Sequence, residues 1–562
     1  MPKIAPSIRD EPKIFAAKEK RAVFPSTRFL MAFILSLCFV ALSVATSNLA
    51  QAMICMIHQR PKAPIAQPSD QHPATLVRLG LIGSEMDQIS TAQPNSSSQL
   101  PPCSEETASS TDVVIEPCQR VQSFEWTSGQ QGAIYAAQNV GSLFMLLIGW
   151  QADRLNGKWT IAAALVLLIL SNSLIPSVAS TSPWLVFVFR VIIGIGDALL
   201  FPSASSMITR WFPPKERPFA VGFVSGGRQI GALVILPLGG FFCQESTRFG
   251  WSAIFYVSAA IGAMMLILWL FLSADKPSKH FCVSPQEEQY IARKITEERL
   301  GKRTVRECPP WRKLARCVPL YVAVAALVCH EYPLVIMLQL LPKYFSDVLG
   351  LSYVVNGVIS SLPSVVLFVS KTLSCILASL LTARKPPLLG STSCCKLFNF
   401  VGSLGLAVCV GITPFLSSNG SPVAAIVVLC LANGFAGMHT PGVQTALVQI
   451  APAYSGTVNG IAFAVAAIFS IANKMLSFYI LSSGSPSQWA IVFGISAVVA
   501  FLPVIFFTRW GSADVQPWAR TPKVPSKQEN TYTTSQTLPP NGNVVKSLAK
   551  GSMFLSYDLS TS

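Results

Sequence analysis

Charged residues are scarce in this chain of 562 residues, at 12% of the total, whereas an ordinary soluble domain has about 25%. Hydrophobic residues make up 51%. A surface in contact with water needs more charged residues than this sequence contains. The composition therefore excludes a water-soluble globular protein. The net charge of +16 would suggest nucleic-acid binding in a soluble protein, but in a chain this apolar we expect no nucleic-acid partner.

The sequence also lacks the short motifs of several enzyme classes. It has no G-x-x-x-x-G-K-[ST] loop for nucleotide phosphates, no H-E-x-x-H metalloprotease motif and no G-x-S-x-G elbow. Its fourteen cysteines form no C-x-x-C or C-x-x-H…H framework for zinc. We therefore expect no enzyme activity, no cofactor, no bound metal and no pumping driven by ATP.

What the chain does contain is long apolar blocks. About twenty apolar residues in a helix cross a hydrocarbon layer of about 30 Å, and hydrocarbon offers the backbone no hydrogen-bond partners, so such blocks must be helical. The period-2 alternation of a membrane β-barrel is absent. The expected fold is an all-α membrane protein with twelve transmembrane helices. The predicted spans are 29–57, 131–150, 159–179, 184–208, 219–242, 251–273, 318–341, 356–381, 397–416, 422–446, 455–481 and 488–508.

The first block has two interpretations, because basic residues precede it. It could be a cleaved signal peptide, whose apolar region runs about 7–15 residues. Residues 29–57 stay apolar for longer than that, which favours a retained helix.

The distribution of basic residues predicts the orientation in the membrane. The tail before Phe29 has seven Lys/Arg and three acids, and the central loop 274–317 has eleven and six. The loop 58–128 reverses the balance, with four Lys/Arg and eight acids. Since Lys and Arg concentrate on the cytoplasmic side, we expect both termini and the central loop to be cytoplasmic, which requires an even number of spans.

The polar central loop divides the spans into six and six. The expected organisation is a cytoplasmic tail (1–28), a first six-helix bundle (29–273, including loop 58–128), the central loop (274–317), a second bundle (318–510) and a disordered cytoplasmic tail (511–562). Within the central loop, residues 285–300 read as an amphipathic helix capped by Ser284. In loop 58–128, Asn95 begins a glycosylation sequon, and Cys103 and Cys118 could form a disulfide.

One short motif points to a known family. The turn between the second and third spans reads G-W-Q-A-D-R-L-N-G-K, which resembles the G-x-x-x-D-R-x-x-G-K motif of the major facilitator superfamily. The resemblance implies two six-helix bundles and a charge relay that stabilises one conformation. The alternative is an ordinary basic turn on the cytoplasmic side. The motif residues are Gly149, Asp153, Arg154, Gly157 and Lys158.

Two charges lie inside the fourth predicted span, where an ionisable group costs at least about 2.5–3.5 kcal/mol. Arg190 and Asp197 are seven residues apart, so they share one helix face, with Phe201 one turn further on. Their separation along the helix, about 10 Å, excludes a direct ion pair, and each needs another partner. An arginine fork suits carboxylate or phosphate oxygens, so we expect Arg190, Asp197 and Phe201 to line a substrate site. The alternative is a pair of structural charges bonded to neighbouring helices.

The other charges inside spans are Arg228, Glu331, Lys371 and Lys474. With Arg190 and Asp197 they give four positive and two negative charges, which favours an anionic substrate. Asp197, Glu331 and the adjacent His330 could couple transport to an ion, although Glu331 could equally be a lone acid near a helix mouth. Lys371 and Lys474 could instead reach the membrane surface with their long side chains.

Further runs are similar to the anion:cation symporters, a family that includes sodium/phosphate, sialic acid and vesicular glutamate carriers. The likeness extends over roughly residues 130–520. It is carried by R-V-I-I-G-I-G-D-A-L-L-F-P (190–202), W-F-P-P-K-E-R (211–217), G-G-R-Q-I-G (226–231), L-P-K-Y-F-S-D-V-L-G (341–350) and I-A-P-A-Y-S-G (450–456).

The chain departs from that family at several polar positions. The family's first helix carries an arginine two residues before an asparagine, and here Thr46 precedes Asn48. Asp197 replaces a glutamate, Ser205 a histidine, and Gln449 an acid. Because Thr46 removes one cation from the expected site, the sequence predicts a preference for a monoanion, or for a larger anion with a neutral hydrogen-bonding end, over glutamate-like dicarboxylates.

The sequence therefore predicts a secondary transporter that carries a small organic anion or phosphate by alternating access, coupled to H⁺, Na⁺ or the membrane potential. The alternative is a transporter-like sensor or structural protein, because several polar residues of the family are missing. No acidic dileucine motif stands in either tail, which favours the plasma membrane over vesicular or lysosomal membranes.

Overall fold

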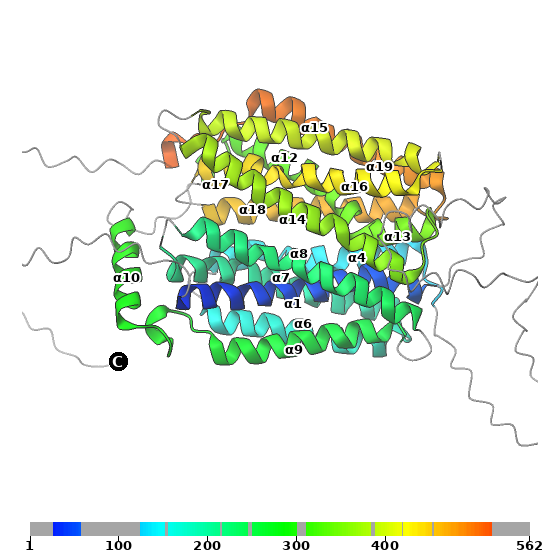
Figure 1. The fold of residues 1–562 in the computed structure, drawn as a ribbon, viewed down its shortest axis with the longest axis horizontal. Coiled ribbons are helices and arrows are strands. Elements are labelled where there is room, and N and C mark those ends of the chain that lie inside the picture. The colour runs from blue at the N-terminus through cyan, green and yellow to red at the C-terminus, as the bar shows by residue number, and fades with distance from the viewer. Residues whose placement is uncertain are drawn as a thin grey trace, which may run out of the picture. The chain divides into compact units, whose positions relative to one another are not determined.

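Nearly every described residue of the computed structural model lies in a helix (Figure 1). Among these residues the only β pairing is an isolated bridge between Ile57 and Phe124. The described ranges are 26–57, 124–151, 156–213, 216–245, 250–299, 311–383, 388–418, 420–451 and 455–519.

The helices fall into two groups along the chain, which Figure 1 shows in its lower and upper halves. The first group, here the N-terminal bundle, comprises α1 (Thr27–Met56), α4 (Ser128–Ser142), α5 (Met145–Gln151), α6 (Gly157–Ala179), α7 (Pro183–Trp211), α8 (Arg217–Gln244) and α9 (Ser252–Leu272).

The second group, the C-terminal bundle, contains two π-helical segments within its long helices. It comprises α12 (Val318–Val335), η4 (Ile336–Leu340), α13 (Leu341–Asp347), α14 (Tyr353–Ala383), α15 (Ser391–Ser418), α16 (Pro422–Gly437), η5 (Thr440–Gln444), α17 (Thr445–Ile450), α18 (Ser455–Ile480) and α19 (Pro486–Trp510). Between the bundles lie η3 (Pro277–Lys279), α10 (Pro285–Arg299) and α11 (Trp311–Leu314), and η7 (Pro517–Ala519) follows α19.

Eleven helical spans among the described residues are long and apolar enough to cross a membrane. The further crossing, predicted as a single span over 131–150, is interrupted between α4 and α5. At the interruption the Ser142 hydroxyl donates to the carbonyls of Gln138 and Asn139, which draws the backbone into a turn. With α4 and α5 counted as one crossing, the fold has the twelve crossings predicted from the sequence.

Polar residues at the span boundaries start the helices. The side chains of Ser26, Ser182 and Ser485 each accept a backbone N–H from the first turn of α1, α7 and α19. Proline follows two of these serines directly, where its missing N–H costs no hydrogen bond. Thr127 and Gln130 form a reciprocal capping box at α4. The helix starts are therefore fixed locally, by the residues that interrupt the apolar blocks.

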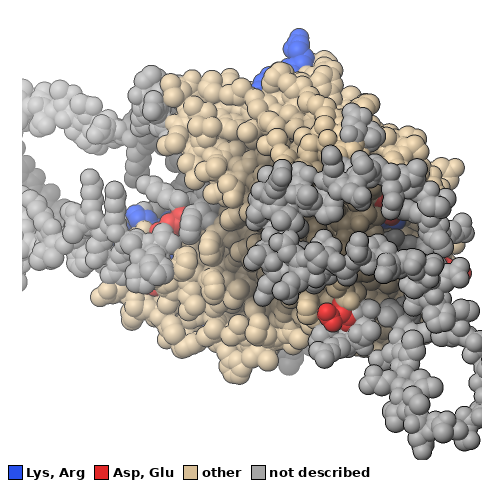
Figure 2. Space-filling model, turned by 45° about the vertical axis from the view of Figure 1, so that its right-hand side comes forward, with Lys and Arg blue, Asp and Glu red and all other residues tan. Residues whose placement is uncertain are grey.

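The outward surface of the bundles is apolar, as a lipid-facing surface requires. Figure 2 shows large areas without Lys, Arg, Asp or Glu. Large hydrophobic side chains stand exposed on both bundles, for example Phe271 (74%) and Phe415 (69%). Exposing these side chains to water would cost free energy, whereas contact with hydrocarbon is favourable for them.

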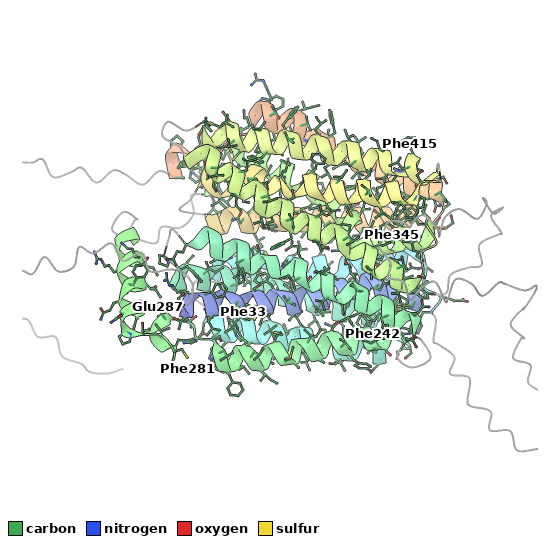
Figure 3. All side chains as sticks on the ribbon, in the orientation of Figure 1. Phe33, Phe242, Phe281, Glu287, Phe345 and Phe415 are labelled. Carbon is green, nitrogen blue, oxygen red and sulfur yellow. A yellow bond between two sulfur atoms is a disulfide. The ribbon has the colours of Figure 1, made fainter. Side chains whose placement is uncertain are left out.

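Helix α10 runs across one end of the bundles (Figure 1), which we call the α10 end, and it is held there by Glu287. The Glu287 carboxylate accepts from the Thr27 hydroxyl (2.5 Å) and from Arg28 Nε (3.0 Å), and Arg28 also pairs with Glu216. Burial tends to raise the pKa of Glu287, but these hydrogen bonds and the Arg28 charge outweigh burial and lower it. Figure 3 shows Glu287 between α10 and the start of α1. The predicted helix over 285–300 is thus present and docked on the N-terminal bundle, with Ser284 capping the Glu287 amide.

The end away from α10, which we call the opposite end, carries a disulfide between Cys55 of α1 and Cys243 of α8. The two Cα atoms are 6.0 Å apart, within the usual range for a disulfide. The sequence analysis considered only Cys103 and Cys118, which lie outside the described residues. It did not foresee this pair, because the two cysteines are 188 residues apart.

Candidate functional site

Helices α4 and α7 approach each other unusually closely, and this contact positions Arg190. A Cβ on Gly141 would lie 2.0 Å from the Val191 carbonyl oxygen, and one on Gly194 would lie 2.0 Å from the Gln138 carbonyl oxygen. Only glycine fits at both positions. The small residues at this crossing therefore bring the polar face of α4 against the Arg190 side of α7.

The Arg190 guanidinium is buried (2% exposed), and within the described part of the chain it bonds only to neutral oxygens. It donates to the carbonyls of Ala45 (3.2 Å) and Thr46 (3.1 Å) on α1. It also donates to the side-chain oxygens of Asn48 (3.5 Å) and Gln138 (3.3 Å). These contacts hold the cation in place without neutralising its charge.

Lys474 of α18 reaches across from the C-terminal bundle to the same helix α4. Its ammonium group is fully buried and donates to the Tyr135 carbonyl (2.9 Å) and to Asn139 Oδ1. Tyr135 and Asn139 are four residues apart, so they share one face of α4. Lys474 does not extend to the membrane surface, which was one interpretation of it from the sequence.

These residues form one cluster that joins the bundles, which we call the Arg190–Lys474 cluster. It consists of Arg190, Lys474, Tyr135, Gln138 and Asn139. Neither cation has a carboxylate partner among the described residues, and the two charges act on each other electrostatically. The acid that acts on Tyr135 is Asp347 of α13, which pairs with Lys343 at 3.0 Å.

Two polar atoms of the cluster are buried without any hydrogen-bond partner in the described part of the chain. They are Arg190 Nε and the Tyr135 hydroxyl. Leaving such a group unpaired costs about 1–3 kcal/mol, and more for a charged group. The cluster therefore offers donors and positive charge to an acceptor that the protein itself does not supply.

Thr46 takes the place of the arginine in the family's first helix. It contacts Arg190 through its backbone. Its carbonyl accepts from Arg190 and its hydroxyl donates to the Ser43 carbonyl (3.2 Å). The adjacent Asn48 is fully buried and donates to Asn172 (2.7 Å) and Ser258 (3.0 Å), which ties α1 to α6 and α9. This part of the site is thus a fixed frame of uncharged hydrogen bonds.

A second group of charges lies nearer the middle of the bundles. Asp197 pairs with Arg228 of α8, whose guanidinium also lies over the Phe39 ring at 5.6 Å. Glu331 of α12 interacts electrostatically with Arg228 and with Lys371 of α14. Asp197 therefore has the separate partner that its distance from Arg190 required, and that partner comes from a neighbouring helix.

The remaining predicted residues of the path are aromatic. Phe201 packs edge-on against Phe39 (6.1 Å between ring centroids) and against Phe463 of α18 (6.0 Å), so it lies between the bundles. His330 stacks on His439, and the ring centroids are 3.7 Å apart. His439 was not considered in the sequence analysis.

The charged turn is described only in part. Gly149 lies in α5, and Asp153 and Arg154 lie outside the described residues. The Gly157 amide donates to the Asp275 carboxylate (2.8 Å), which also pairs with Arg210. The Lys158 ammonium donates to the carbonyls that end α9, Leu270 (2.7 Å) and Ser273 (2.9 Å). The described half of the motif therefore fixes the start of α6 to the end of α9.

Sequence reasoning missed Tyr135, Gln138, Asn139 and His439. A sequence signal did exist for α4, because Gln138 and Asn139 are adjacent polar residues inside an apolar block. Their roles follow from the contact of α4 with both α7 and α18, which no local pattern contains.

Comparisons with known proteins agree with this arrangement. The family model described as Major Facilitator Superfamily matches residues 107–474. The chain is 28% identical to sodium-dependent phosphate transport protein 3 of Mus musculus, over 71% of this chain and 82% of that protein. It is 26% identical to sialin of Homo sapiens, over 77% of this chain and 85% of that protein.

A solved structure shows the same fold. The xylose transporter XylE from E. coli, in a partially occluded inward-open conformation, superposes with a TM-score of 0.54 at 14% identity, over 86% of this chain and 99% of that one. The predicted fold class and the resemblance to the anion:cation symporters are thereby confirmed. The chain is a multi-pass membrane protein that belongs to the major facilitator superfamily, and its relatives lie in the anion:cation symporter group.

Proposed function

We propose that this protein is a secondary transporter that carries a small organic anion or inorganic phosphate across a membrane by alternating access. The observation that carries the proposal is the Arg190–Lys474 cluster. Two cations lie buried without a carboxylate partner among the described residues, and each comes from a different bundle. Uncompensated buried charge is costly, so an anion is the ligand that this cluster stabilises best.

The chemistry of the two cations suggests the size of the anionic group. The Arg190 guanidinium presents a planar fork, whereas the Lys474 ammonium is a point charge. A single carboxylate or phosphate could accept from Arg190 Nε on one side and from Lys474 and the Tyr135 hydroxyl on the other. This arrangement supports the preference for a monoanion that Thr46 predicts. The names of the relatives, which mention phosphate and sialin, also support a small anionic substrate.

The cluster also suggests how binding is linked to movement. Lys474 is a hydrogen-bonded tie between α18 and α4, and therefore between the bundles. An anion that took over the Lys474 ammonium would weaken this tie and allow the bundles to move apart. Asp197, Glu331 and His330 are the residues that we propose for coupling to H⁺ or Na⁺, because they are the anionic and titratable groups near the interface.

We propose that the α10 end is cytoplasmic and that the protein resides in the plasma membrane. The Lys/Arg asymmetry of the sequence supports this orientation. The Cys55–Cys243 disulfide at the opposite end also supports it, because disulfides persist on the non-cytoplasmic side. Tags at either terminus should then be accessible only in permeabilised cells, and Asn95→Gln should remove glycan mass. Labelling of a terminal tag on intact cells would contradict this orientation.

Flux in proteoliposomes tests the proposed function. Purified full-length protein should exchange radiolabelled phosphate, sialic acid, urate or glutamate across the bilayer, with monoanions taken up faster than glutamate-like dicarboxylates. Protein-free liposomes and the Arg190→Ala variant are the controls. Absence of flux for the whole panel would favour the transporter-like sensor instead.

A further inference from the structure

The histidine pair of the C-terminal bundle is buried and unusually isolated. The rings of His330 and His439 lie parallel, 6° from coplanar orientation, with centroids 3.7 Å apart. The two residues are 6% and 2% exposed. Neither ring nitrogen of His439 has a hydrogen-bond partner among the described residues. Buried polar groups normally have partners, so an imidazole with two unpaired nitrogens needs an explanation.

Each helix of the pair also leads into a π-helical segment. His439 directly precedes the π-helical segment η5, and η4 begins six residues after His330. π-Helical segments break the regular ladder of helix hydrogen bonds and are frequent at functional sites. The stacked histidines therefore join the two helices that lead into the π-helical segments.

No ion pair to either histidine is found among the described residues. The electrostatic partner of His439 is His330, whereas Glu331 interacts with Arg228 and Lys371. Elements packed near the pair carry further titratable groups. These groups are Cys329, Glu331 and Tyr332 on α12, Lys371 and Cys375 on α14, Cys394, Cys395, Lys396 and Cys409 on α15, Cys430 on α16, Lys474 on α18 and Arg509 on α19.

From this geometry we infer that the His330–His439 pair is a proton-binding site that links protonation to the conformation of the C-terminal bundle. The inference rests on the proposed function and specifies its coupling ion. Two imidazolium ions cannot stack at 3.7 Å, so the pair takes up one proton at most. In the present conformation a protonated His439 would have two N–H donors and no acceptor among the described residues, which disfavours the protonated form.

A proton therefore binds better to any conformation in which the rings separate and meet acceptors. A ligand shifts a conformational equilibrium by the difference between its affinities for the two states. Falling pH consequently favours the rearranged bundle, and rising pH favours the stacked one. The histidine pair would in this way transmit a proton gradient to α12 and α16, the helices that carry η4 and η5.

The test compares His439→Phe with His439→Gln in full-length protein reconstituted into proteoliposomes. Phenylalanine keeps a flat ring in the stack but binds no proton, and glutamine keeps polarity without the ring. His280→Gln, which changes a histidine at the α10 end, is the matched control. A gradient of one pH unit coupled to one proton supports an accumulation ratio of about ten. We expect the wild type and the control to approach that ratio with phosphate or sialic acid.

Both His439 variants should lose accumulation, to a ratio of about one, and should exchange substrate at a rate independent of pH between about 5.5 and 7.5. Wild-type accumulation and pH dependence in His439→Phe would overturn the inference, because a stacking role alone survives that substitution. If the wild type moves no anion, the proposed function fails, and the pair is then judged by the melting temperature of the full chain in nanodiscs. Its dependence on pH should disappear in His439→Phe but not in His280→Gln, and identical pH profiles would refute the proton site.

Discussion

The two bundles treat their buried charges differently. In the N-terminal bundle Arg190 bonds to four oxygens, Asp197 pairs with Arg228, and Arg28 pairs with two glutamates. In the C-terminal bundle Lys474 bonds only to the other bundle, and His439 has no partner in the described part of the chain. Both π-helical segments of the described helices also belong to the C-terminal bundle.

This contrast suggests that the two bundles have different roles in transport. Arg190 is held by oxygens of α1 and α4 and Asp197 by Arg228, so the N-terminal bundle can serve as a preorganised half of the binding site, although Arg190 Nε and the Tyr135 hydroxyl remain unpaired there. The C-terminal bundle holds groups without partners next to interrupted helices, and such groups gain free energy when they rearrange. The following predictions test this contrast.

The largest expected effect is on Arg190. Arg190→Ala should lower substrate exchange by roughly a hundredfold or more, because a hydrogen bond to a charged group is worth about 1.5–3 kcal/mol and several are lost. Arg190→Lys keeps the charge but loses the fork, so a smaller loss, about tenfold, is expected. Arg312→Ala, which removes an exposed arginine at the α10 end, is the control. Exchange at the wild-type rate in Arg190→Ala would assign the anion to another site.

The comparison becomes sharper when stability is measured for both cations. Lys474→Met should reduce exchange, by roughly tenfold, and yet raise the melting temperature by about 1 °C, as a gain of about 1 kcal/mol does in a chain of this length. Arg190→Met should lower the melting temperature, because four oxygens lose their donor, including those of the Asn48 and Gln138 side chains, whereas Lys474→Met leaves only two such oxygens. Melting of both variants in nanodiscs decides the point. A loss of stability in Lys474→Met equal to that in Arg190→Met would show that the bundles do not differ.

A smaller and more selective effect is expected for the acids near the middle of the bundles. Asp197→Asn and Glu331→Gln should retain substrate exchange but lose accumulation driven by a pH gradient. Asp197→Asn should also lower stability, because Arg228 loses its carboxylate partner, whereas no hydrogen bond to Glu331 stands among the described residues. Accumulation by both variants would remove the two acids from the coupling mechanism and leave the histidine pair as the remaining site.

The smallest effect concerns α10 rather than transport. The pKa of Glu287 lies below its ordinary value of 4.5, so its contribution to docking is present above that pH and is lost as the pH falls through the lowered pKa. Glu287→Gln should produce the same loss at pH 7. Amide hydrogen exchange in α10 should then accelerate by about tenfold or more, whereas the neighbouring Glu288→Gln should have little effect. Unchanged exchange in Glu287→Gln would show that α10 is held by other contacts.

The fold followed from the sequence because its signals are local. Apolar blocks of membrane length and the cap at Ser284 each depend on a few consecutive residues, and they placed nearly all the helices. The interruption at Ser142 and the segments η4 and η5 were not predicted. A serine hydroxyl within a helix can bond back to the preceding turn without ending the helix, so the apolar block looks the same with or without the interruption at Ser142.

Only the charged residues of the site could be predicted from the sequence. Arg190, Asp197 and Lys474 were found because ionisable residues inside a span are conspicuous. Their partners were not found, because pairing depends on which helices pack together. Arg228 was recognised as a buried charge but not as the partner of Asp197. Tyr135 and His439 carry no charge, so nothing distinguished them from ordinary core residues.

The Cys55–Cys243 disulfide also marks a late step in the assembly of the N-terminal bundle. It joins the far end of the first span to the far end of α8, and four crossings lie between them along the sequence. During synthesis this bond can form only after α8 has been inserted beside the first span. The oxidised and reduced forms differ in a covalent loop of 188 residues, which a non-reducing gel can resolve. A pulse-chase experiment on such gels would thus follow the maturation of the N-terminal bundle in the cell without any substrate.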